Sequence, residues 1–225
     1  MKSIAGLHGF VSAAAALCIN AIPVGIVLGW GRSFATALVL YFIETWLGIL
    51  LTVALLYLRA PAEDPAYAET ELNAMTVTVN GVPQRRNPTR SRAELVRWFL
   101  IFALAFGGVP AIFLAFWIFG VAHVPLSWSA VASGITGMLA FQAVNFISQL
   151  FAFRSMTPAA AKALINQGMG RVGVIYLAVF AGMLLALFFS PWWFIIPFAI
   201  LKTLVDVSYA LQTARSVRSL VAQPG

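Results

Sequence analysis

Residues 34–58 form an unbroken apolar run that carries a single charged side chain, Glu44. About 20 apolar residues are enough for an α-helix to cross a bilayer, and a helix satisfies its own backbone hydrogen bonds there. The run therefore predicts a transmembrane helix. A carboxylate held deep in a membrane costs several kcal/mol when it has no partner. Glu44 thus requires a cation or strong hydrogen-bond donors from another part of the chain.

Five further apolar runs divide the rest of the sequence. The chain has 225 residues, of which 61% are hydrophobic and only 9% charged, and its mean hydropathy is +0.92. Soluble domains carry about 25% charged residues, so the composition argues against a soluble globular fold. We predict an all-α membrane protein, a single six-span domain over residues 1–225, with spans at about 6–28, 34–58, 95–121, 127–153, 171–189 and 192–211.

The first span follows Met1 and Lys2, a charged start that resembles a signal peptide. Its apolar run is too long for a signal peptide and has no convincing cleavage site. We therefore expect it to be retained as a transmembrane helix.

The connector at 154–170 contains a helix start, because Thr157 is a good N-cap and Pro158 suits the first helical position. We expect a short helix over 159–166 on the membrane surface, ended by Gly168 and Gly170. Arg171 then opens the fifth span, and we interpret it as a basic anchor that extends towards the membrane surface.

Residues 59–94 form the one long polar loop. Its first half is acidic and its second half is basic. Residues 75–79 alternate like a strand, and Asn80 with Gly81 is a turn signal. Two interpretations stay open: a short β-hairpin within about 75–82, or a flexible loop.

The basic residues are distributed unevenly about the six spans. With six spans, both termini share one side with the 59–94 loop and the 154–170 connector. That side holds twelve basic residues against one, Arg32, on the other side, and such an excess marks the cytoplasmic face. We expect a bacterial cytoplasmic (inner) membrane with both termini cytoplasmic. The twelve are Lys2, Arg59, Arg85, Arg86, Arg90, Arg92, Arg97, Arg154, Lys162, Arg171, Arg215 and Arg218.

Lys202 and Asp206 are the other charges set deep in an apolar run. The spans that hold Glu44 and Lys202 run in the same direction, and both residues lie about ten residues inside, so they share a depth. Asp206 lies one turn beyond Lys202 on the same helical face. Asn20 and Gln142 fall near the same level. The sequence therefore predicts an intramembrane polar cluster of Glu44, Lys202, Asp206, Asn20 and Gln142.

Two interpretations of this cluster stay open. It is either a structural clasp, in which Lys202 sits between two carboxylates and holds the bundle in register, or a site for a proton, an ion or a lipid headgroup. Buried ion pairs often specify an arrangement more than they stabilise it. Intramembrane ionisable residues, on the other hand, commonly mark function.

The sequence contains no catalytic or cofactor-binding motif that we recognise. There is no phosphate-binding loop and no His/Cys/Asp set with metal-ligand spacing. His8 and His123 fall on opposite sides of the membrane, and Cys18 is the only cysteine. We predict no metal, no cofactor and no enzymatic activity.

Several different short motifs are distributed along the spans. In these motifs the chain resembles a bacterial and archaeal family of small integral membrane proteins of unknown function. The resemblance covers most of the chain apart from residues 60–93, and it implies that the three charged residues act as one unit. It brings no known activity. The motifs are Asn20-Ala-Ile-Pro23, Gly29-Trp30, Tyr41-Phe-Ile-Glu44 with Gly48, Gly170-Arg171 and Lys202-Thr203-Leu-Val-Asp206.

We expect an accessory or scaffold subunit of a larger bacterial membrane complex. Eleven of the 14 basic residues are arginine, a bias typical of GC-rich bacterial genomes, and an envelope lipid-transport assembly of the Mce type is one candidate host. The alternative is a small ion-, proton- or lipid-handling transporter that uses the Glu/Lys/Asp cluster. Expected partners are membrane lipids and other membrane subunits. Nucleic acid is not expected, because the excess of basic residues serves as an orientation signal.

Overall fold

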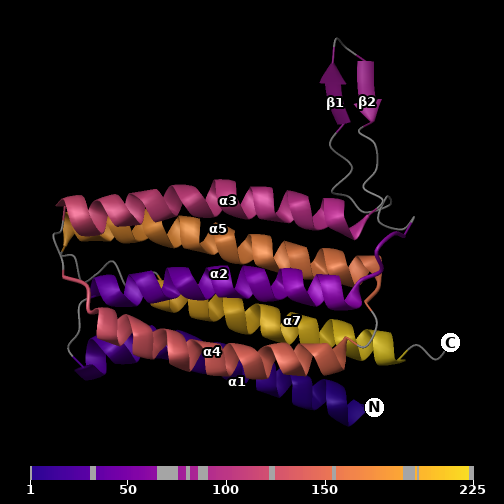
Figure 1. Cartoon of the computed structure of the whole chain (residues 1–225), viewed down its shortest axis with the longest axis horizontal. Coiled ribbons are helices and arrows are strands. Elements are labelled where there is room, and N and C mark those ends of the chain that lie inside the picture. The colour runs from indigo at the N-terminus through magenta and orange to yellow at the C-terminus, as the bar shows by residue number, and fades with distance from the viewer. Residues whose placement is uncertain are drawn as a thin grey trace.

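The apolar runs fold into long helices that lie side by side in a bundle (Figure 1). The computed structural model describes residues 2–30, 34–64, 76–79, 82–85, 91–121, 125–153, 156–189, 196 and 198–222. Its helices and strands are α1 (Lys2–Trp30), α2 (Phe34–Arg59), β1 (Thr76–Val79), β2 (Val82–Arg85), α3 (Arg92–Ala115), η3 (Phe116–Val121), α4 (Trp128–Ala152), α5 (Pro158–Phe188), η5 (Phe198–Lys202) and α7 (Thr203–Ala222).

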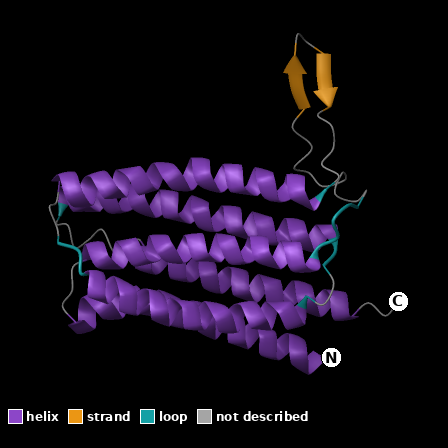
Figure 2. Ribbon diagram, in the orientation of Figure 1, coloured by secondary structure: helices purple, strands orange, loops and turns teal. Residues whose placement is uncertain are grey.

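Five of the described helices are long and apolar enough to cross a membrane: Gly9–Leu28, Phe34–Arg59, Arg92–Gly120, Trp128–Ala152 and Pro158–Gly182. The all-α membrane fold is thereby confirmed. The predicted sixth span, 192–211, starts among residues outside those described, and its described part is η5 followed by α7. Figure 2 shows how completely helices account for the bundle.

Helix α2 lies at the centre of the bundle. It contacts α1, α3, α4 and α5, and Leu38, Leu40 and Tyr41 on it are fully buried. Around it, α1 packs against α4 and α7, while α3 packs against α5. Any polar group on the inner faces of these helices is therefore shielded from lipid by α2 and its neighbours.

Both termini and the loop between α2 and α3 lie at one end of the bundle, called here the termini end (Figure 1). At the base of this loop, Glu63 and Ser91 form an isolated β-bridge. Arg92 donates from Nη1 to the carbonyl oxygens of Tyr57 and Ala60, at 2.9 and 2.7 Å. The loop is thus tied to the last turn of α2, where those carbonyls have no helical partner.

The predicted hairpin is present within this loop. Strands β1 and β2 pair antiparallel, with Thr76 opposite Arg85 and Val79 opposite Val82. The expected strand residue Met75 and the expected turn residues 80–81 lie outside the described residues.

The predicted break between a surface helix at 159–166 and a fifth span starting at Arg171 is wrong. Helix α5 runs without interruption from Pro158 to Phe188, with Thr157 as its N-cap. Gly168 and Gly170 do not end the helix. They give room for large side chains of neighbouring helices, Phe99 on α3 at Gly168 and Tyr209 on α7 at Gly170. Each glycine costs a helix about 1 kcal/mol, which close packing offsets.

This packing predicts the effect of adding one methyl group at Gly168. A Cβ there would lie 2.5 Å from Phe99 Cζ, whereas a Cβ at Gly173 would meet nothing within 4 Å. We expect Gly168→Ala to lower the free energy of unfolding by about 1–3 kcal/mol, because overpacking displaces the aromatic ring. Gly173→Ala is the matched control, and we expect it to leave stability unchanged or slightly raised. Thermal unfolding in detergent micelles measures both, and equal stability of the two variants would contradict the close packing at Gly168.

Candidate functional site

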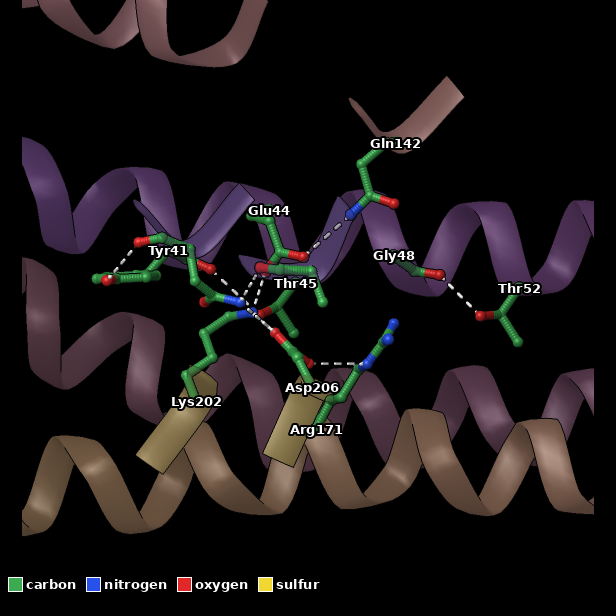
Figure 3. Close-up of polar contacts among 11 residues, drawn as sticks. Tyr41, Glu44, Thr45, Gly48, Thr52, Gln142, Arg171, Lys202 and Asp206 are labelled. Atoms are coloured by element: carbon green, nitrogen blue, oxygen red, sulfur yellow. Dashed lines mark hydrogen bonds and ion pairs between the residues drawn. The ribbon is translucent and has the colours of Figure 1, made fainter. Parts of the chain in front are cut away.

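Glu44, Lys202 and Asp206 meet in the middle of the bundle, from α2, η5 and α7 (Figure 3). The Nζ atom of Lys202 forms an ion pair with Glu44 Oε2, and it lies 2.6 Å from Asp206 Oδ2. Each of the three residues is only 3% exposed. Lys202 therefore bridges two carboxylates in surroundings where Coulomb attraction is much stronger than in water.

Two buried amides also donate to the carboxylates, Gln142 to the second oxygen of Glu44 and Asn20 to the Asp206 oxygen that Lys202 already contacts. Gln142 on α4 donates from Nε2 to Glu44 Oε1 at 3.0 Å. Asn20 on α1 donates from Nδ2 to Asp206 Oδ2 at 2.9 Å and to the Ala16 carbonyl oxygen at 2.9 Å. The structure thus brings together all five residues of the polar cluster predicted from the sequence, and they come from four parts of the chain.

Arg171 is the member that the sequence interpretation misplaced. Its Nε atom lies 3.1 Å from Asp206 Oδ1, so it belongs to the cluster and is no anchor at the membrane surface. Because α5 begins at Pro158, Arg171 lies about 20 Å along the helix. The helix start at Thr157 and Pro158 was the sequence signal for this position. Counting residues from Pro158 instead of from Arg171 places Arg171 deep in the membrane.

Gly48 on α2 leaves the space that the Arg171 side chain occupies. A Cβ at position 48 would lie 3.3 Å from Arg171 Nη1, and Figure 3 shows Arg171 extending from α5 towards this part of α2. The small residue is therefore explained by the approach of a guanidinium group.

The net charge of the cluster is zero when its four ionisable side chains carry their usual charges. Glu44 and Asp206 supply two negative charges, and Lys202 and Arg171 supply two positive charges. A neutral group of ion pairs costs far less to bury than an uncompensated charge. Asp206 contacts two cations while Glu44 contacts one, so the neutralisation is uneven.

The charged pair on the last helix lies where a π-helical turn passes into an α-helix. Lys202 is the final residue of η5, and Asp206 lies in the first turn of α7. Residues four apart on a helix share one face, which lets both side chains point to α2. Such π turns are rare overall, and many of those that occur lie at functional sites.

Tyr41 closes the cluster on the side away from the termini end. Its side chain is fully buried, and its hydroxyl donates to the Asn20 carbonyl oxygen at 3.0 Å. Phe34, Leu38 and Ile175 pack in the same apolar group as Tyr41. The cluster therefore borders on dry apolar packing in this direction.

On the other side, towards the termini end, the cluster borders a polar cavity of about 30 Å³. From the charged layer its lining continues by one to two turns along α1, α4, α5 and α7. Amide and hydroxyl groups dominate the lining. The residues are Ser12, Ala16, Ile19, Asn20, Glu44, Gln142, Asn145, Gln149, Gln167, Arg171, Asp206, Tyr209 and Ala210.

Within the described part of the chain, no group of three or more His, Cys, Asp or Glu side chains is arranged to hold a metal ion. His123 and the side chain of His8 lie outside that part. The absence of a cofactor stays a prediction.

Similarity to known proteins is limited to one family. No curated protein and no solved structure matches the chain. One family matches, described as a family of unknown function (DUF6498), and the match covers residues 8–222. That range includes every residue of the charged cluster and all the helices except the first six residues of α1. The chain therefore belongs to the family of unknown function DUF6498.

Proposed function

We propose that the protein is a small transporter that moves a proton or a small ion across the membrane by way of its charged cluster. One observation carries this proposal: four ionisable side chains lie together at mid-depth in the bundle, and three of them, Glu44, Arg171 and Asp206, line a polar cavity. Intramembrane charges that face a cavity are typical of ion and proton pathways. A purely structural clasp needs no such cavity beside it.

The size of the cavity narrows the choice of transported species. At about 30 Å³ it holds water-sized species. A lipid headgroup is much larger, so a proton or a small ion is favoured over lipid handling.

The proposed membrane is the bacterial cytoplasmic membrane, with the termini end in the cytoplasm. The distribution of basic residues supports this orientation. Arg171 no longer counts among the twelve residues on the side of the termini, because it lies in the charged cluster. Eleven then remain on the side of the termini against Arg32 on the other. The positive-inside asymmetry persists with this correction.

An accessory subunit of a larger membrane complex, with an Mce-type lipid-transport assembly as one host, is the second candidate. The zero net charge of the cluster supports this candidate, because a static clasp requires that every buried charge be paired. Gentle detergent extraction from the native host followed by mass spectrometry tests this candidate. A stoichiometric set of partner subunits would support it, and a clean monomer or homo-oligomer would argue against it.

Glu44→Gln separates the two candidates. The amide keeps the shape of the side chain and an oxygen that accepts from Gln142, while it removes the negative charge next to Lys202. We expect a folded, monodisperse protein that no longer moves protons or ions in proteoliposomes with an internal pH-sensitive dye and imposed sodium or potassium gradients. Glu63→Gln, at an exposed position of the loop, is the matched control and should behave like the wild type.

Two results would contradict the transporter proposal. One is a Glu44→Gln variant with wild-type flux, and the other is the absence of proton, sodium and potassium flux in the wild-type protein itself. Loss of folding or of assembly in Glu44→Gln would favour the clasp.

A pair of variants at Lys202 tests how much the charge balance of the cluster contributes to stability. Lys202→Met leaves the carboxylates of Glu44 and Asp206 with Arg171 as the sole cation, and we expect it to lower the free energy of unfolding by about 3–5 kcal/mol. The double variant Glu44→Gln/Lys202→Met restores the neutral sum and should recover most of that stability. Chemical unfolding in micelles measures both variants. A double variant less stable than Lys202→Met would show that charge balance is not what holds this layer together.

A further inference from the structure

We propose that the polar cavity is a water-filled path open to the termini end only, and that it delivers protons to Glu44. This inference rests on the proposed function, because it names the transported species and the residue that takes it up. Three features of the structure support it: unpaired hydrogen-bond acceptors at the cavity, the two carboxylates that line it, and the apolar seal beyond them.

The orientation of the Asn20 amide is fixed by its partners. Its Nδ2 atom donates to both Ala16 and Asp206, so Oδ1 is the amide atom left to accept a hydrogen bond at the cavity that Asn20 lines. Asn20 is 2% exposed, and its Oδ1 atom has no hydrogen-bond partner among the described residues. A buried acceptor left without a donor costs about 1–3 kcal/mol. A water molecule in the cavity supplies that donor.

Two more residues that line the same cavity have a buried oxygen without a partner in the described chain, Ser12 at Oγ and Asn145 at Oδ1. Ser12 lies two turns from Asn20 on α1, so the unpaired oxygens extend over about 12 Å towards the termini end. The cavity volume of about 30 Å³ is enough for more than one water molecule. Polar atoms spaced in this way hold a file of waters along which a proton can pass.

Glu44 is the carboxylate best suited to accept that proton. Both Glu44 and Asp206 line the cavity, whereas Lys202 does not. Asp206 contacts two cations, Lys202 and Arg171, while Glu44 contacts Lys202 alone and shares it. Protonation therefore removes less Coulomb attraction at Glu44 than at Asp206.

Side chains from several helices surround Glu44, and both cations of the cluster come from helices other than α2. Lys202 approaches from η5, Asp206 from α7 and Arg171 from α5, while Gln142 on α4 and Asn20 on α1 are uncharged. On α2 itself, Tyr41 lies one turn away. The charged residues described on α3 belong to its first two turns, near the termini end: Arg92, Glu94 and Arg97.

The proton step is a simple transfer. A hydronium ion in the cavity gives its proton to a carboxylate oxygen of Glu44, which leaves water and a neutral carboxylic acid. Lys202 then retains its ion pair with Asp206 and loses the one with Glu44. Return of the proton to water restores the original pairs.

The seal makes the path one-sided. Beyond the cluster, Tyr41 is fully buried and bonded to the Asn20 carbonyl, and Leu38 and Ile175 pack with it. A proton in this arrangement enters and leaves Glu44 from the termini end.

Thiol accessibility tests the path without reference to transport. Ser12→Cys in a Cys18→Ala background places a thiol in the cavity, and the native Cys18, exposed on the outside of α1, is the matched control in lipid. We expect Ag⁺, a thiol-reactive ion close in size to a water molecule, to react with Cys at position 12 from the termini end at least about tenfold faster than with Cys18, because the reactive thiolate forms only in water. The reagent should have no effect from the opposite side. Equal rates for the two thiols, or equal rates from the two sides, would overturn the one-sided path.

Infrared spectroscopy during a pH titration tests the proton acceptor. We expect acidification to produce the carbonyl stretch of a buried protonated carboxylic acid in the wild type and in Glu63→Gln, and not in Glu44→Gln. A band that persists in Glu44→Gln, or no such band in the wild type, would overturn the assignment. Neither measurement requires flux, so failure of the path or of the acceptor is distinguishable from failure of the transport proposal.

Discussion

Neutralisation of buried carboxylates is the constraint on which the rest of this structure depends. Two carboxylates are buried at mid-depth in the bundle, and each must find positive charge and donors there. Lys202 satisfies this need from the last helix and Arg171 from α5. Because the partners come from different helices, the cluster links α2, α5 and α7 and fixes the depth of each relative to the others.

The helical architecture and much of the cluster could be predicted from the sequence for a physical reason. Six apolar runs leave few alternatives in a bilayer, and rare polar residues at equal depth have few other places to go. Glu44, Lys202, Asp206, Asn20 and Gln142 were all found by counting depth along the spans. The structure brings them into contact with each other, although contact alone does not assign them a role.

Arg171 and the course of α5 could not be predicted by the same reasoning, because it treated two glycines as helix ends. Gly168 and Gly170 instead give room to Phe99 and Tyr209, and such contacts depend on which helices become neighbours. Local sequence carries little information about that choice. The polar cavity was missed as well, since it depends on small displacements among four helices.

The spacing of the charges along the chain also bears on how the protein is made. Lys202 and Asp206 lie one turn apart on the last helix, so this helix can leave the translocon with its own counter-ion. Glu44 is synthesised much earlier, and neither cation of the cluster, Lys202 or Arg171, exists until α5 and the last helix have emerged. The second helix therefore passes through a stage of biosynthesis in which its carboxylate has to be protonated, shielded by water or held by the insertion machinery.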